Sequence, residues 1–147
     1  MFNLFKEAKF VRAITPTEGV AGATDINGAV CDMSGYDSVA MLVCFGAITA
    51  GAVTSIKAQQ GALSNGTDMA DLEDTAQTVA DDDDEQMFII DLHRPKEEYV
   101  RVTVDRGTQN AVVTEAWYIL YNGRQHPVTQ PTGVNGELHV SPAEGTA

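Results

Sequence analysis

The sequence predicts an all-β fold: a single antiparallel β-sandwich, jelly-roll or immunoglobulin-like, with extended N- and C-terminal arms. Thirteen glycines and five prolines in 147 residues indicate many turns between short strands. The segment from Val39 to Phe45 is apolar at every position and follows a Ser34-Gly35 turn. Its side chains alternate between two apolar sets, Val39, Met41, Val43 and Phe45 on one face and Ala40, Leu42 and Cys44 on the other. We therefore expect a strand that is covered on both faces.

Two strand candidates precede this segment. Residues 9–14 form the first, and Pro16 interrupts the pattern at its end. A connection rich in Gly and Thr then occupies residues 15–28. Residues 29–31 add a short strand before the turn at Ser34-Gly35.

The middle of the chain contains one clear strand and one ambiguous region. Residues 53–60 alternate in polarity, which predicts an outer strand with Lys57 facing water. A turn follows over residues 61–67, where Asn65-Gly66 is the strongest local turn signal. Residues 68–79 are compatible with a short helix, but we interpret them as a short strand and a loop.

Three strands are predicted in the second half of the chain. Residues 87–92 form one, which ends before Pro95 because proline cannot donate to a strand ladder. Residues 98–105 alternate cleanly, residues 106–110 form a hairpin loop, and residues 111–121 form the long final strand.

The final strand carries the only tryptophan, and we expect Trp117 to be buried against Val100, Val102 or the strand around Leu42. Both faces of this strand are apolar, with Val113, Trp117, Ile119 and Tyr121 on one and Tyr118 and Leu120 on the other. The predicted core comprises Val39, Leu42, Val43, Phe45, Phe88, Ile90, Val100, Val102, Trp117 and Ile119. Two double-sided strands indicate that a terminus or a neighbouring subunit covers one outer face, although core packing alone is an alternative.

The chain divides into a β-sandwich domain over residues 1–125, with a short N-terminal arm, and an extended C-terminal arm over residues 126–147. The arm has too few apolar residues to fold alone. One interpretation is a disordered terminus. The other is an arm that becomes ordered on a neighbour, with the candidate interface residues Pro127, Pro131, Leu138, His139 and Val140.

Charge limits the choice of partners. Nine Lys and Arg against 21 Asp and Glu give a formal net charge of −12. Such a surface repels DNA and anionic lipid, so we expect no direct contact with nucleic acid or membrane. A simple role in solubility is the alternative explanation.

The sequence contains no pattern of catalytic or metal-binding residues, so we expect no enzyme, no cofactor and no metal site. Residues 81–85 are five consecutive acidic residues without the alternate spacing and glycine of a calcium loop, which is typical of a solvated loop. Cys31 and Cys44 are expected to be reduced thiols. The histidines, at 93, 126 and 139, are far apart.

The N-terminus carries charges where the apolar part of a signal peptide would lie, and no apolar stretch reaches the ~20 residues that span a bilayer. We therefore expect a protein that is made in the cytoplasm and stays soluble.

Two strings in the chain resemble a family of small structural proteins of tailed bacteriophages. They are GYDSVAMLVCFGAITAGAVTSIKAQQG and YVRVTVDRGTQNAVVTEAWYILYNGRQHPVTQP. In that family a D-x-x-G-Y-D-S-V strand, a G-x-I-T-x-G turn, a Y-V-R-V strand and a final strand ending near an Arg and a Pro recur in this order. The resemblance covers roughly residues 22–131.

The resemblance implies a virion structural protein, and most directly a capsid decoration, or cement, protein on the capsid exterior. Its partners would be the major capsid protein and further copies of itself, as a dimer or trimer. A neck or tail protein, or a virion-displayed β-sandwich that binds a glycan or receptor, are the alternatives. The sequence does not separate capsid from neck or tail.

Overall fold

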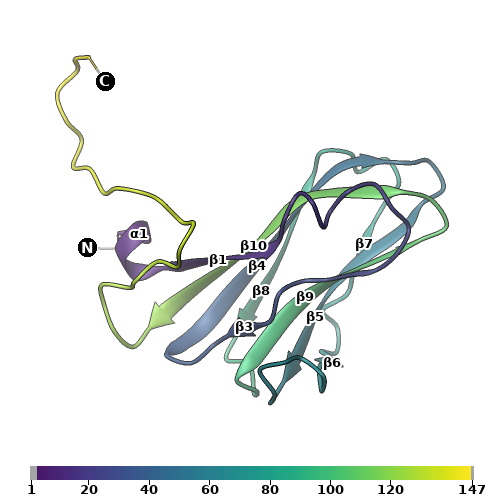
Figure 1. Cartoon of the computed structure of the whole chain (residues 1–147), viewed down its shortest axis with the longest axis horizontal. Coiled ribbons are helices and arrows are strands. Elements are labelled where there is room, and N and C mark those ends of the chain that lie inside the picture. The colour runs from purple at the N-terminus through teal and green to yellow at the C-terminus, as the bar shows by residue number, and fades with distance from the viewer. Residues whose placement is uncertain (1–2, 147) are drawn as a thin grey trace.

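The structure, a computed structural model, describes residues 3–146 and consists of two packed antiparallel sheets (Figure 1). Sheet A has the order β1 (Lys9–Ile14), β10 (Ala111–Gly123), β4 (Tyr36–Ile48) and β8 (Met87–His93). Sheet B has the order β2 (Ile26–Asn27), β9 (Tyr99–Gly107), β5 (Val53–Gly61) and β6 (Ala70–Asp71), with β3 (Cys31–Asp32) paired to β9 and β7 (Gln77–Val79) paired to β5. One short helix, α1 (Leu4–Glu7), precedes β1. The predicted all-β sandwich is confirmed.

The core lies between the two sheets and consists of alternate residues of their long strands. Sheet A contributes Val39, Met41, Val43, Phe45, Ile90, Val113, Ala116, Tyr118 and Leu120, and sheet B contributes Ile56, Ala58, Val100, Val102 and Val104. Phe88 is half-buried and packs edge-on against Phe45, with ring centroids 5.7 Å apart. Of the predicted core residues, four are not among the buried ones: Leu42, Phe88, Trp117 and Ile119.

A β-bulge in β10 explains the outward positions of Trp117 and Ile119, whereas Leu42 lies on the outer face of β4 because the alternation of that strand places it there. Val113 pairs with Phe45 and Glu115 pairs with Cys44, so β10 advances two residues while β4 advances one. An extra residue reverses the inward and outward alternation beyond it. The inward residues after the bulge are therefore Ala116, Tyr118 and Leu120, and Trp117 and Ile119 point outward from sheet A.

Tyr118 joins the two sheets through the core. Its hydroxyl donates to the carbonyl oxygen of Ala29 at 2.8 Å and accepts from the backbone N–H of Val102 at 3.0 Å. Val102 faces the break between β2 and β3, so its N–H has no strand partner on that side. The Tyr118 hydroxyl satisfies this buried donor and fixes the spacing of the sheets.

Arg106 closes one end of the sandwich, and its position corrects the predicted loop over residues 106–110, because β9 continues to Gly107. The side chain is only 7% exposed. Its guanidinium donates to the carbonyl oxygens of Val20, Thr24 and Ala111 at 2.7–2.8 Å. A single buried cation therefore holds the long N-terminal connection against the end of β10.

Among residues 3–146, no helix has the length and apolar character that crossing a bilayer would require.

Candidate interaction surfaces

The outer face of sheet A is apolar across most of its width. One row runs across all four strands, because Arg12 pairs with Trp117, Trp117 with Leu42, and Leu42 with Ile89. Toward the β8 edge this face is open, with Ile89 45% and Met87 53% exposed. An exposed apolar face of this kind is typical of an interaction surface.

An apolar groove of about 310 Å³ lies on this face, and its lining residues are Phe10, Leu42, Trp117, Ile119 and Val134. The Arg12 guanidinium lies 4.5 Å from the centroid of the Trp117 ring and 3.8 Å from the Glu115 carboxylate. It therefore covers part of the indole while remaining partly solvated. Trp117 and Leu42 are neighbours, as expected, but Val100 and Val102 belong to the core on the other side of sheet A.

The C-terminal segment supplies Val134 to the groove because it is attached to the N-terminal segment of the same chain. Gln130 makes three contacts there: its amide nitrogen donates to the carbonyl oxygens of Phe5 and Ala8 at 2.9 and 2.8 Å, and its oxygen accepts from the N–H of Phe10 at 3.0 Å. The N–H of Val128 also donates to the Lys6 carbonyl oxygen at 2.8 Å. Nothing in the residue types alone indicates these contacts, which join positions 120 or more apart.

The structure divides the predicted interface residues into two groups. Pro131 is half-buried in the attached segment, and Pro127 near its start is exposed. Leu138, His139 and Val140 are exposed and belong to no strand within residues 3–146. Their only paired side chain is His139, whose Nε2 lies 3.1 Å from a Glu137 carboxylate oxygen.

A polar cluster borders the apolar face near the end of β8. The Ser38 hydroxyl lies 2.7 Å from His93 Nδ1, and the Tyr121 hydroxyl donates to the Asp91 carboxylate at 2.6 Å. The bond to Asp91 raises the pKa of Tyr121, and partial burial adds to this effect. Ser38 is fully buried, so a substrate cannot reach its hydroxyl. The Ser38–His93 pair is a structural link between β4 and β8, and the sequence patterns did not indicate it.

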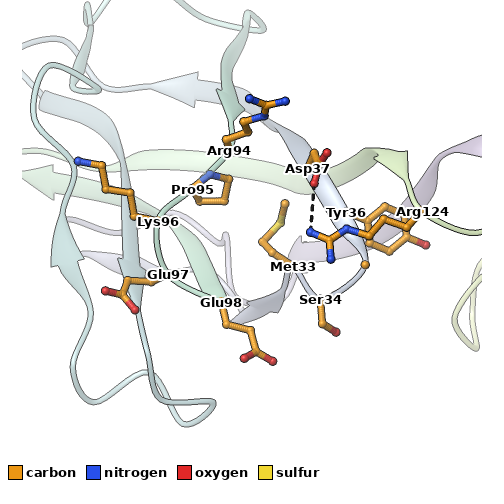
Figure 2. A pocket seen from close by; sticks show the side chains of 11 residues that line it. Met33, Ser34, Tyr36, Asp37, Arg94, Pro95, Lys96, Glu97, Glu98 and Arg124 are labelled. Atoms are coloured by element: carbon orange, nitrogen blue, oxygen red, sulfur yellow. Dashed lines mark hydrogen bonds and ion pairs between the residues drawn. The ribbon is translucent and has the colours of Figure 1, made fainter.

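A second depression, of about 570 Å³, lies at the end of β4 and β8 (Figure 2). Arg124 donates to Asp37 at 3.5 Å, whereas Arg94 and Lys96 point away from that pair. Three cations and three carboxylates line the depression, the carboxylates being Asp37, Glu97 and Glu98. Because the charged groups do not converge on one point, this depression lacks the arrangement of an anion-binding site.

The acidic run over residues 81–85 is tied to a turn. Asp81 and Asp84 accept from the backbone N–H groups of Gly51 and Ile48, at 2.5 and 2.6 Å, and thereby hold the turn between β4 and β5. Asp83 accepts from the N–H of Ala80 within the run at 2.9 Å. Within the part of the chain that the structure covers, no three His, Cys, Asp or Glu side chains are grouped to hold a metal ion.

Both cysteines are free thiols. Burial raises the pKa of Cys31 to about 12, and burial likewise raises the pKa of Cys44 on the outer face of sheet A. Both thiols are therefore protonated at neutral pH and poorly nucleophilic.

Comparisons of the chain with models of protein families, with curated proteins and with solved structures found no match. What the protein does is therefore inferred from its own surfaces and from its motifs.

Proposed function

We propose that the protein is a non-enzymatic structural component of a tailed-phage virion that binds the outside of the capsid and stabilises it. The observation that carries the proposal is the apolar outer face of sheet A, with Ile89 and Met87 open to solvent. The resemblance of the strand motifs over residues 22–131 supports the virion assignment. The proposed partners are the major capsid protein and further copies of the same chain.

The physical case rests on the contrast between this face and the rest of the molecule. A chain with a net charge of −12 has ample polar surface, so an apolar band across four strands is a specific feature that a partner must cover. On a closed shell, the same contact is repeated many times. Modest affinity at each site then gives strong overall attachment through avidity.

The acidity favours an exterior position. Negative charge repels the packaged genome and weakens any contact with nucleic acid or anionic membrane. The protein would be made in the host cytoplasm and join preassembled shells from outside.

Two alternatives remain open. A neck or tail protein would share these surface features, but it would be present in few copies. A glycan-binding module would need an open aromatic platform. Here Arg12 covers part of the Trp117 ring and Val134 lies beside it, so the ring is not an open platform. This observation argues against a glycan-binding module.

The test uses particles of the phage that encodes the chain, prepared without its gene. Purified protein is added back, bound copies are counted by gel densitometry, and the melting temperature of the particles is measured. We expect hundreds of copies per particle and a higher melting temperature. A handful of copies would indicate the neck or tail instead, and equal melting temperatures with and without bound protein would contradict a stabilising role.

A matched pair of variants connects the result to the apolar face. Ile89→Asp places a charge on the open part of this face, and Val53→Asp makes the same kind of change on β5, where Val53 is 67% exposed. We expect fewer bound copies for the first variant and wild-type binding for the second. Equal binding of the two variants would show that the protein does not attach to the capsid through the outer face of sheet A.

A further inference from the structure

We infer that the apolar outer face of sheet A, from the groove at Leu42 to the exposed residues of β8, receives the C-terminal arm of a second copy of this chain. Leu138 and Val140 of that arm pack toward Leu42 and Ile89. The inference concerns the free protein and is tested without capsids. It uses the same exposed residues as the proposed capsid contact, so on a capsid the shell would take the place of the arm on this face.

One wall of the groove is formed by this terminal segment. Val134, in an irregular stretch of the chain, lines the groove together with Phe10, Leu42, Trp117 and Ile119. A segment without strand pairing can thus lie along this face. Beyond Leu42 the apolar surface continues to Ile89 and Met87 on β8, which the chain's own arm leaves exposed.

The chain's own arm does not reach that open half. After Val134 it passes α1, where Gly136 lies so close to Phe5 that a Cβ atom on Gly136 would come within 2.7 Å of the ring. From there it projects past α1 and away from both sheets, as Figure 1 shows in yellow. Leu138 and Val140 are therefore carried away from β8, and Val140 is 88% exposed. In this position the chain's own arm leaves the apolar surface around Ile89 and Met87 uncovered.

The spacing of the apolar side chains on the arm suits this role. In an extended chain, residues two apart point to the same side about 6.5–7 Å from each other, so Leu138 and Val140 can contact one surface together. Adjacent strands are separated by about 4.8 Å, which places Leu42 and Ile89 within the span of these two side chains.

The projecting arm and the exposed apolar surface around Ile89 are different parts of the molecule, so each molecule can donate its arm and accept the arm of another. Such an exchange closes either as a two-fold pair or as a ring of three. In the two-fold pair and in the ring of three, every arm is bound and every acceptor surface is covered. Open chains of molecules would leave both unfilled at their ends.

The experiment measures the mass of the full chain in solution by sedimentation equilibrium. We expect a mass two or three times that of one chain for the wild type. Truncation after Gly136 keeps the contacts of Gln130 and Val134 and removes only the projecting arm, and it should reduce the mass to that of one chain. Ile89→Asp should do the same. Val53→Asp is the control and should assemble as the wild type does, while circular dichroism shows that every variant is folded.

Complementation adds a second readout. The Ile89→Asp variant keeps its arm, and the truncated variant keeps its groove, so a mixture of the two should form pairs that neither forms alone. A single-chain mass for the wild type, or wild-type assembly by the truncated chain, would overturn the inference. Failure of the two folded variants to pair, at concentrations well above those that assemble the wild type, would overturn it as well.

Discussion

The outer surfaces of the two sheets differ in polarity. On sheet B, Lys57 lies 3.0 Å from Asp71 and 3.1 Å from Asp105, and Gln59 accepts from Arg101 at 2.6 Å. On sheet A the equivalent surface holds Leu42, Trp117, Ile119 and Ile89. One face is a polar network that water can solvate, and the other is an apolar surface that only protein can cover well.

This difference shows how one sandwich can combine a surface for solubility with a surface for assembly. The core between the sheets is complete without the outer face of sheet A, because the inward residues of β4 and β10 are already buried. The outward apolar residues therefore add less to folding than the inward ones and are free to serve an interface. The variants below compare the interior, the apolar face and the polar face in order of expected effect.

The largest effect should come from the interior. Tyr118→Ala removes a fully buried ring and both of its hydrogen bonds, and it should lower the free energy of unfolding by at least ~3–5 kcal/mol. Urea unfolding followed by circular dichroism measures the loss. Tyr118→Phe is the control, since it keeps the ring and isolates the cost of losing the two hydrogen bonds of the hydroxyl, to the Val102 N–H and the Ala29 carbonyl oxygen. Unchanged stability in both variants would contradict the proposed link between the sheets.

The apolar face should respond less. Trp117 is half-buried on the outer surface, so Trp117→Ala should cost roughly 1–3 kcal/mol, below the value for a core aromatic residue, and the variant should fold. The same unfolding measurement tests this, with assembly measured in parallel. Acrylamide should quench the tryptophan fluorescence of the wild type at an intermediate rate. A loss as large as that of Tyr118→Ala would place Trp117 in the folding core after all.

The strands could be predicted from sequence because their signals are local. Alternation in residues 98–105 and the double-sided apolar run at 39–45 both depend on neighbours along the chain. β4 includes the apolar run, and β9 begins one residue later than predicted, at Tyr99, and includes the rest of the alternating segment. The side chains that face the core in β10 could not be predicted in the same way. The bulge after Val113 depends on the pairing with β4, and it moved Trp117 and Ile119 to the outer face.

The surface features were less accessible still. The hydrogen bonds of Gln130 to α1 and β1, the capping of Gly51 by Asp81 and the hydrogen bonds of Arg106 to Val20 and Thr24 all join residues that are distant in sequence. A charged or amide residue carries no sign of which backbone group it will meet. The sequence nevertheless indicated, through two double-sided strands, that a terminus or neighbour would cover an outer face, and Val134 of the C-terminal segment lies there.

Gln130→Ala should loosen the part of the apolar face that the chain covers itself. Three hydrogen bonds to backbone groups are lost, but water can replace most of them at this partly buried site, so we expect about 1 kcal/mol or less in global stability. The effect should be local, with faster amide exchange in residues 126–136 and easier proteolysis there. The control is Gln125→Ala, which changes an exposed glutamine of the same segment. Unchanged exchange would show that Val128 and Val134 alone hold the segment.

The smallest effect should come from the polar face. Lys57→Met breaks two ion pairs whose carboxylates are largely solvated, so we expect a loss of less than about 1 kcal/mol at neutral pH, which salt should reduce further. Thermal melting at low and high salt measures it. A loss above that of Trp117→Ala would reverse the comparison between the two faces.

The pH dependence gives this last prediction a sign. Hydrogen bonds from Gln59 and then Lys57 lower the pKa of Asp71 below its usual ~4, so its contribution is present above that pH and is lost as the pH falls through the lowered pKa. Hydrogen bonds to Asp71 and Asp105 raise the pKa of Lys57 above ~10.4, so its contribution is present below that pH and is lost as the pH rises through the raised pKa. The stability difference between wild type and Lys57→Met should therefore be flat between these limits and shrink outside them. Melting temperatures of both proteins across this range test it, and a difference that grows in acid would show that Lys57 and Asp71 do not stabilise each other.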